Sequence, residues 1–222
     1  PLQGMSGEHF RGLVRAFVNV FPDSGMFFVD GAVALVGGPD PLSLDYARVA
    51  AALAAPAVKA DLAEVGYDDP LRALGTYVSG GEALVEFAAS APPLTDERPV
   101  LEFHPIPTNK TMKHLWENLT HMFDLRSALT RLPMTLPDAA DADVLTDRLQ
   151  LALHSGNQLL AGLREFEASV LLTRARQPDA ARGALENARQ AFALAANLDP
   201  DDPAARRNHH RVERVWPGIR AR

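Results

Sequence analysis

Histidines and aspartates are the side chains of this sequence whose spacing bears on chemistry. His114 and His121 are seven residues apart, so a helix would place them on one face, as two metal ligands require. No carboxylate is placed to complete that pair, and core or surface histidines are the better interpretation. His209 and His210 are adjacent and would point in different directions on a helix. The sequence therefore predicts no metal site.

Asp199, Asp201 and Asp202 form a dense group of carboxylates. This group lacks the glycine and the distal glutamate of a calcium-binding loop, so we expect it to cap a helix. The glycine pairs at 37–38 and 80–81 lie at the ends of predicted elements and match neither a dinucleotide-binding nor a phosphate-loop pattern. The absence of cysteine excludes disulfides and thiol chemistry. The residues by themselves therefore indicate no self-contained active site.

The composition is that of a globular protein with unevenly distributed charge. The 222 residues are 47% hydrophobic and 23% charged, with a formal net charge of −6. Residues 203–222 hold six arginines and one glutamate, so this tail carries +5 and residues 1–202 carry −11. The negative charge of residues 1–202 disfavours general nucleic-acid binding. The tail is either a solvated helix end or a contact for phosphate or an anionic membrane surface.

Periodicity and turn residues define the expected elements of residues 1–107. Ser6 can cap a helix, and apolar residues recur at helical spacing from Phe10 to Phe21. Asp30-Gly31 separates the apolar runs 26–29 and 32–36, which predicts an antiparallel hairpin, and we expect both of its faces to be covered. Four short helices are expected between residues 43 and 90. Prolines make residues 91–107 extended.

The sequence of residues 108–222 predicts long helices. No apolar run in the sequence approaches the roughly 20 residues that a membrane helix needs. We expect helices from Thr108 or Asn109 onward, over 143–176 and 178–197, and in front of Trp216-Pro217, with a linker at 133–141. Short connections favour antiparallel neighbours, so we expect residues 108–200 to pack as antiparallel helices. The side chains expected to be mostly buried are Leu149, Leu153, Leu160, Leu163, Phe166, Leu171, Leu185, Phe192 and Leu194.

Three stretches of residues 1–107 share a pattern with a known family. They are Ser6-Gly7-Glu8-His9-Phe10 with Val20-Phe21-Pro22, then Leu35-Val36-Gly37-Gly38 with Pro41-Leu42, and finally Thr95-Asp96-Glu97-Arg98-Pro99-Val100-Leu101-Glu102-Phe103. This pattern resembles the C-terminal half of spermidine synthase-like proteins (polyamine aminopropyltransferases), above all the bacterial kind fused behind a membrane segment. The resemblance implies a Rossmann-like, seven-stranded sheet whose last two strands form a hairpin. We therefore expect an α/β fragment, mostly α: the end of a methyltransferase-type sheet followed by a helical hairpin or bundle.

The resemblance also implies what this chain lacks. The loop that holds decarboxylated S-adenosylmethionine, the substrate of the family, and the aspartate base would lie upstream of Pro1. No cofactor-binding residue is therefore expected here, and the chain alone is expected to be inactive. Asp96 and Glu102 are the candidate catalytic residues, because carboxylates bind polyamine cations and accept a proton. The structural alternative is that Asp96 caps a turn beside Arg98 and Glu102 faces solvent.

A second resemblance lies near the C-terminus. Ala188, Phe192, Ala195 and Pro200 have the spacing of the second helix of a tetratricopeptide repeat, in which small residues let two helices approach closely. The preceding helix lacks the matching Trp-Leu-Gly-Tyr set, so this would be one degenerate repeat. An ordinary helical hairpin explains the spacing equally well.

These observations suggest three segments: 1–107, the spermidine synthase-like part; 108–141, helix and linker; and 142–222, a tetratricopeptide-like helical region with a basic tail. The function expected is the C-terminal portion of an aminopropyltransferase, and the alternative is a helical protein–protein interaction module without catalytic activity. The expected partner is the upstream half of the same protein, and self-association and a membrane anchor ahead of Pro1 stay open as further alternatives. Nucleic acid is not an expected partner. The expected location is the cytoplasm or the cytoplasmic face of a bacterial inner membrane.

Overall fold

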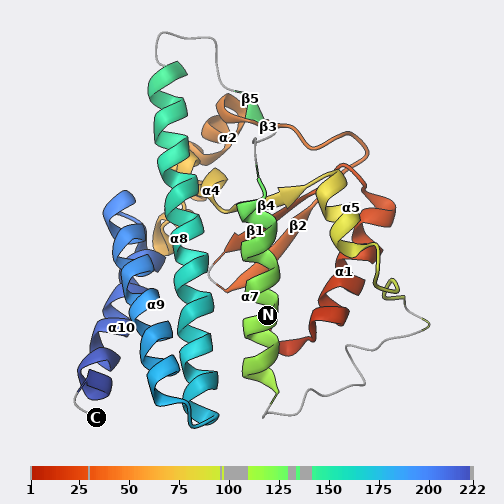
Figure 1. Cartoon of the computed structure of the whole chain (residues 1–222). Helices are drawn as coiled ribbons and strands as arrows, with labels where there is room; N and C mark the ends of the chain where they lie inside the picture. The colour runs from red at the N-terminus through yellow and green to blue at the C-terminus, as the bar shows by residue number, and fades with distance from the viewer. Residues whose placement is uncertain are drawn as a thin grey trace. The chain divides into compact units, whose positions relative to one another are not determined.

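The computed structural model describes residues 2–29, 31–95, 97, 110–129, 134–135 and 142–220, those after 215 by their backbone only. The chain is mostly helical and contains a small antiparallel sheet (Figure 1). It forms two compact units: unit 1 is Pro1–Leu42 with Tyr77–Thr130, and unit 2 is Ser43–Thr76 with Arg131–Arg222. The units divide the chain differently from the segments 1–107, 108–141 and 142–222, because residues 43–76 pack with the C-terminal helices.

Unit 1 is a three-stranded sheet with helices packed around it. Its elements are η1 (Leu2–Gly4), α1 (Gly7–Val20), β1 (Gly25–Val29), β2 (Ala32–Val36), β4 (Tyr77–Gly80), α5 (Glu82–Ala88) and α7 (Thr111–Ser127). The strand order is β2-β1-β4, and both pairs are antiparallel. Helix α7 packs against β4, and α1 packs against α5 and α7.

Local signals explain the first helix and the hairpin. Ser6 caps α1, because its hydroxyl accepts a hydrogen bond from the backbone N–H of His9 at 3.2 Å. The hairpin forms as predicted, with Val29 paired to Ala32. Gly31 has a φ of +86°, a conformation that costs glycine little and other residues more.

Two expectations for the sheet were wrong. Strand β2 is not covered on both faces, since its residues alternate between exposed and half-buried and Val36 is 44% exposed. The third strand, β4, was not expected at all, because the sequence suggests a helix end and a glycine-rich turn there. Tyr77 and Val78 are nevertheless buried, and β4 pairs with β1 with a bulge between Met26 and Phe27.

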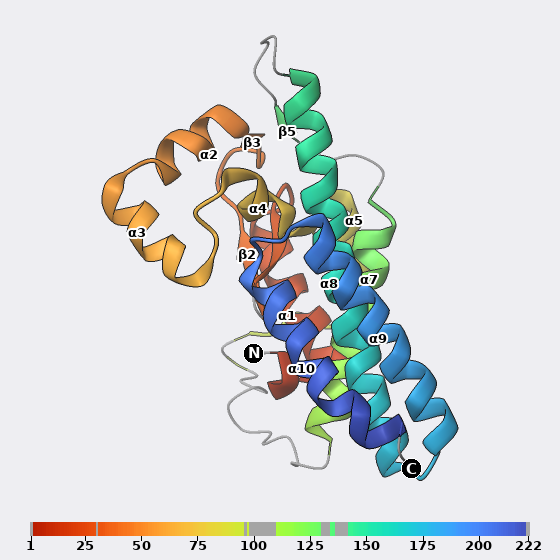
Figure 2. The ribbon, with the colours of Figure 1, turned by 90° about the vertical axis from the view of Figure 1, so that its left-hand side faces the viewer.

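Among its described residues, unit 2 is helical apart from one parallel pair of two-residue strands. Its elements are β3 (Leu44–Asp45), α2 (Tyr46–Leu53), α3 (Pro56–Val65), α4 (Pro70–Gly75), β5 (Met134–Thr135), α8 (Ala142–Arg174), α9 (Pro178–Leu198) and α10 (Pro203–Arg220). Figure 2 shows α8, α9 and α10 side by side, and α4 packs against α8. Pro56, Pro70 and Pro178 each stand at the start of a helix, where the missing N–H costs nothing.

The packing of α8 and α9 as an antiparallel hairpin was expected, and most of the predicted core is found. The expectation that the helix after residue 108 packs with them was wrong, because α7 belongs to unit 1, where it packs against η1, β4 and α1. Leu149, Leu160, Phe166, Leu185 and Phe192 are buried. Leu153, Leu163 and Leu171 are half-buried. Leu194 was predicted wrongly, since it is 39% exposed. It lies two residues after Phe192, about 200° around a helix with 3.6 residues per turn, and so faces away from the core.

Two helix ends differ from expectation. The described part of α7 begins at Thr111 after Lys110, whose side chain makes no capping bond, and Thr108 and Asn109 lie outside the described residues. Helix α10 continues past Pro217 to Arg220 instead of stopping before Trp216. Within the described residues, no helix combines the length and the apolar character needed to cross a membrane.

Candidate functional site

The two candidate catalytic carboxylates, Asp96 and Glu102, lie outside the described residues. The segment that leads to Asp96 is held against α1: the N–H of Leu94 donates to the carbonyl of Gly12 at 3.2 Å. A Cβ on Gly12 would lie 2.8 Å from the carbonyl oxygen of Pro92, so a larger residue would displace this segment. The chain that precedes Asp96 is therefore positioned by a glycine of α1.

Unit 2 contains a cavity of about 160 Å³ with charged walls. It lies where α4, α8 and the turn after α9 come together. Its charged lining residues are Asp69, Arg72, Arg148, Asp199 and Asp201, and its apolar lining residues are Leu71, Leu151, Ala152 and Leu198. Three carboxylates thus face two guanidinium groups. We take this cavity as the candidate site.

The central contact of the cavity is a two-point ion pair between Arg72 and Asp199. Nε of Arg72 donates to Oδ2 of Asp199 at 2.8 Å, and Nη2 donates to Oδ1 at 3.2 Å, the geometry that makes Arg–carboxylate pairs strong. Nη1 donates to the carbonyl of Gly66 at 2.8 Å. Burial by itself lowers the pKa of Arg72, but the hydrogen bond and charge of Asp199 outweigh it, so that the pKa is raised.

Asp69 plays two roles at the edge of the cavity. Its Oδ1 caps α4 by accepting from the backbone N–H groups of Leu71 at 2.7 Å and Arg72 at 3.2 Å. Its Oδ2 meets Nη2 of Arg148 at 3.2 Å, but the Arg148 side chain is 55% exposed. This outer ion pair is therefore weaker than the inner one, because solvent screens it.

The turn Asp199–Asp202 supplies the remaining carboxylates. Asp202 is buried and caps α10 by accepting from the N–H of Ala204 at 2.8 Å, as the sequence predicts. Burial raises the pKa of Asp202. The carboxylate of Asp201 is exposed and has no hydrogen-bond or ion-pair partner among the described residues. One uncompensated negative charge therefore remains at the cavity rim.

This arrangement can hold charge but offers no nucleophile with a base beside it. In the described part of the chain, the cavity is lined by carboxylates, guanidiniums and apolar side chains, with no hydroxyl, imidazole or amine. Its excess of carboxylate suits a small cation better than an anion. No three metal-ligating side chains cluster among the described residues, so nothing there contradicts the expectation of no metal site.

The histidines have separate partners. Nδ1 of His114 lies 3.2 Å from Oε2 of Glu117, whereas Nε2 of His121 lies 3.1 Å from Nη1 of Arg11 in α1. The ring of His209 lies 6.3 Å from that of His210, centroid to centroid, and Nε2 of His209 is 3.7 Å from Oε1 of Glu213. The pairing of His114 with His121 on one metal is therefore not seen.

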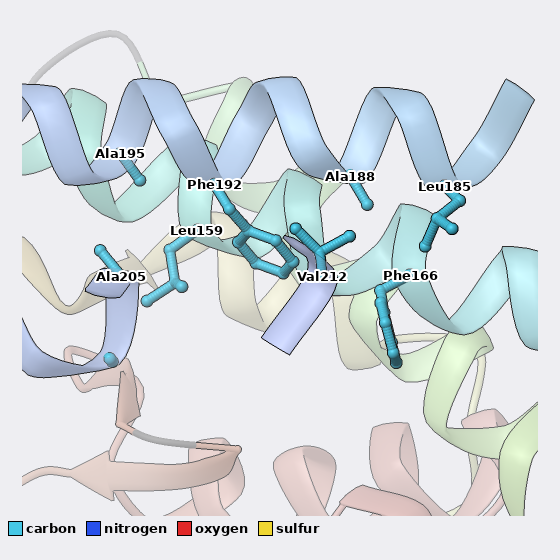
Figure 3. Packing of buried hydrophobic residues seen from close by; sticks show 9 residues of the cluster. Leu159, Phe166, Leu185, Ala188, Phe192, Ala195, Ala205 and Val212 are labelled. Carbon is cyan, nitrogen blue, oxygen red and sulfur yellow. The ribbon is translucent and has the colours of Figure 1, made fainter. Parts of the chain in front are cut away.

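The repeat-like residues do lie together in unit 2. Ala188, Phe192 and Ala195 are buried on one face of α9. Figure 3 shows Phe192 pointing from α9 toward Leu159 of α8 and Val212 of α10. The spacing noticed in the sequence thus marks the face of α9 that packs against both neighbouring helices.

Sequence reasoning missed most of the cavity. Asp69 had a signal, because Asp69-Pro70 is a common helix start, and Asp199, Asp201 and Asp202 were recognised as a cap. Arg72 had none, since it lies 127 residues before its partner Asp199. Comparisons of the chain with protein-family models, curated proteins and solved structures find no match.

Proposed function

We propose that this chain is the C-terminal portion of a spermidine synthase-like aminopropyltransferase and does not transfer aminopropyl groups by itself. The observation that carries the proposal is the outer strand β2. Among the described residues β2 pairs with β1 alone, and its side chains are exposed or half-buried. Unpaired strand edges are a liability that proteins normally cover. An upstream half of a Rossmann-like sheet, as the resemblance implies, would continue the sheet at this edge.

The reaction of such an enzyme is a nucleophilic substitution at carbon. The amine of putrescine attacks the carbon next to the sulfonium of decarboxylated S-adenosylmethionine, a C–N bond forms, the C–S bond breaks, and a thioether leaves. A carboxylate accepts the proton that the amine loses. On this chain Asp96 and Glu102 bind the cationic amine, and the base lies in the upstream half.

The test compares the longer gene product that the proposal requires with the 222-residue chain. Each is incubated with decarboxylated S-adenosylmethionine and putrescine, and spermidine is detected by mass spectrometry. We expect product from the longer protein and none from the chain. If neither protein forms spermidine, the proposed activity is wrong. If the 222-residue chain forms spermidine by itself, the proposed location of the active site upstream of Pro1 is wrong. A gene without such an upstream half would contradict both proposals.

Variants of the longer protein test the two carboxylates. Asp96→Asn and Glu102→Gln should each raise KM for putrescine, since each removes a negative charge from the amine site. Glu97→Gln, which removes a charge from the same segment, is the matched control and should leave KM unchanged. If all three behave alike, Asp96 and Glu102 have only a structural role.

The helices of unit 2 favour a second candidate function, a protein–protein interaction module. Its support is the close packing of α8, α9 and α10 around Phe192, together with the repeat-like spacing of Ala188 and Ala195. Leu194 is exposed on the opposite side of α9 and is available for a partner or a second copy. Sedimentation velocity over a range of concentrations tests self-association: Leu194→Glu should abolish any dimer, and a monomer at all concentrations would contradict self-association. On either proposal we place the protein in the cytoplasm or at the cytoplasmic face of the inner membrane.

A further inference from the structure

A contact between an arginine and a histidine joins α1 to α7 in unit 1. Nη1 of Arg11 and Nε2 of His121 are 3.1 Å apart. A guanidinium only donates hydrogen bonds, so Nε2 must be the acceptor and the imidazole must be neutral, with its proton on Nδ1. A protonated His121 has no acceptor to offer, and the contact would then join two cations.

The ring of His121 lies close to residues of α5 and of α1. Its ring packs edge-on against the ring of Phe87 in α5, with 5.7 Å between centroids. On the other side lies Gly7, where a Cβ would be 3.1 Å from Nε2 of His121. A protonated ring in this position would bring two cations together at the α1–α7 contact.

The same joint is held by a second, neutral contact. Nδ2 of the buried Asn118, one turn before His121 on α7, donates to the carbonyls of Leu2 and Met5, both at 2.9 Å. Two atoms of the joint, Nε of Arg11 and Oδ1 of Asn118, are buried without a hydrogen-bond partner among the described residues. Buried polar atoms without a partner make the closed joint less stable than a fully hydrogen-bonded one.

The groups around His121 have opposing effects on its pKa. Burial lowers the pKa of His121 most, and the charge of Arg11 on α1 lowers it further. Asp124 and Glu117, on α7 itself, raise it by smaller amounts, and the net direction is down. The contact from α5 is the uncharged ring of Phe87. The closed joint therefore resists protonation, and by linkage protonation must favour the open joint.

We propose that Arg11 and His121 form a pH-sensitive latch between α1 and α7, closed while His121 is neutral and open when weak acid protonates it. Opening frees the η1 segment and the first turns of α1 from α7, so that the backbone hydrogen bonds of these turns break more often and their amides exchange. Each unit by which the pKa of His121 in the open joint exceeds that in the closed joint makes opening about tenfold more favourable after protonation.

Amide hydrogen exchange of the whole chain measures the opening directly. Between pH 7.5 and 5.5, after correction for intrinsic exchange, we expect protection of the amides in the first turns of α1 to fall, by at most about tenfold for an open-joint pKa near 6.5. His121→Gln should remove this fall, because the glutamine carbonyl accepts from Arg11 and does not titrate. His114→Gln is the matched control: it removes a histidine from the same helix that faces Glu117, and the fall should persist.

A second measurement does not depend on the glutamine variant being well folded. In NMR titrations we expect His121 to titrate below pH 6.5 in the unmodified chain and closer to 6.5 in Arg11→Gln, which keeps a donor but removes the charge. Arg11→Gln should also weaken the acid-induced loss of α1 protection. A His121 that titrates at or above 6.5, or an acid-induced loss that is unchanged in both His121→Gln and Arg11→Gln, would overturn the latch.

Discussion

The ring of Phe192 in α9 packs directly against Gly162 of α8, in the space that a side chain at position 162 would occupy. A Cβ at position 162 would lie 2.5 Å from Cδ1 and from Cε1 of Phe192, far inside van der Waals contact. Phe192 is 1% exposed, and Leu159 and Val212 complete its surroundings (Figure 3). The close approach of α8 and α9 therefore depends on a glycine in a helix interior, where glycine costs about 1 kcal/mol relative to alanine.

Removing the ring of Phe192 should lower the free energy of unfolding considerably. Phe192→Ala removes a fully buried aromatic side chain, and we expect a loss of about 3–5 kcal/mol in the free energy of unfolding. Urea unfolding of the whole chain is the measurement, since unit 2 includes residues 43–76 as well as the C-terminal helices. Leu194→Ala, two residues away and 39% exposed, is the control and should cost far less. Equal losses would show that Phe192 is not the centre of this core.

Filling the space beneath the ring should also destabilise the chain. Gly162→Ala improves helix propensity, but its methyl group collides with the ring, and we expect a net loss of about 1–3 kcal/mol. In the double variant with Phe192→Ala the collision is gone, so Gly162→Ala should become neutral or stabilising in that background. The same urea titrations supply this cycle. Additive effects of the two substitutions would contradict the contact.

The inner ion pair of the cavity should matter more than the outer one. Arg72→Met breaks a two-point hydrogen-bonded pair whose side chains are 14% and 19% exposed, and should cost about 1.5–3 kcal/mol. Arg148→Met breaks the exposed pair with Asp69 and should cost less than about 1 kcal/mol. Thermal unfolding of the two variants at one ionic strength gives the comparison. A larger effect at Arg148 than at Arg72 would mean that the cavity is not held together by Arg72.

The buried carboxyl of Glu167 in α8 should make stability depend on pH. Burial raises its pKa, while the charges of Arg211 and Arg174 oppose this without cancelling it. The folded state thus binds more protons than the unfolded state, so stability is highest below the unfolded pKa, about 4.3, and falls as pH rises through the folded pKa.

Glu167→Gln removes this dependence. Its melting temperature should exceed that of the unmodified chain at pH 7–8, and the gain should vanish as pH falls toward 4, where Glu167 is protonated in both states. Glu165→Gln on the same helix, whose carboxylate pairs with Arg164 at 2.7 Å, is the matched control and should show no such gain. A gain that is constant with pH would have to come from packing instead of charge.

Neighbouring residues determined many of the elements. The cap at Ser6, the turn that contains Gly31, and the prolines that open α3, α4 and α9 depend on residues close together in the sequence, so they could be recognised without a fold. The sequence did not indicate strand β4, because four residues between two short helices are too few to show a hydrophobic periodicity. Only pairing with β1 makes Tyr77–Gly80 a strand.

The tertiary structure decided the cavity and the core contacts. Nothing near Arg72 indicates Asp199, and nothing near Gly162 indicates Phe192, because each pair is brought together by helices that are far apart in the sequence. The same reason explains the error at Leu194: hydrophobicity identified it as core, but the side of α9 on which it lies is set by where α8 and α10 pack. Dihedral preferences and caps are properties of adjacent residues, whereas ion pairs and packing depend on three-dimensional neighbours.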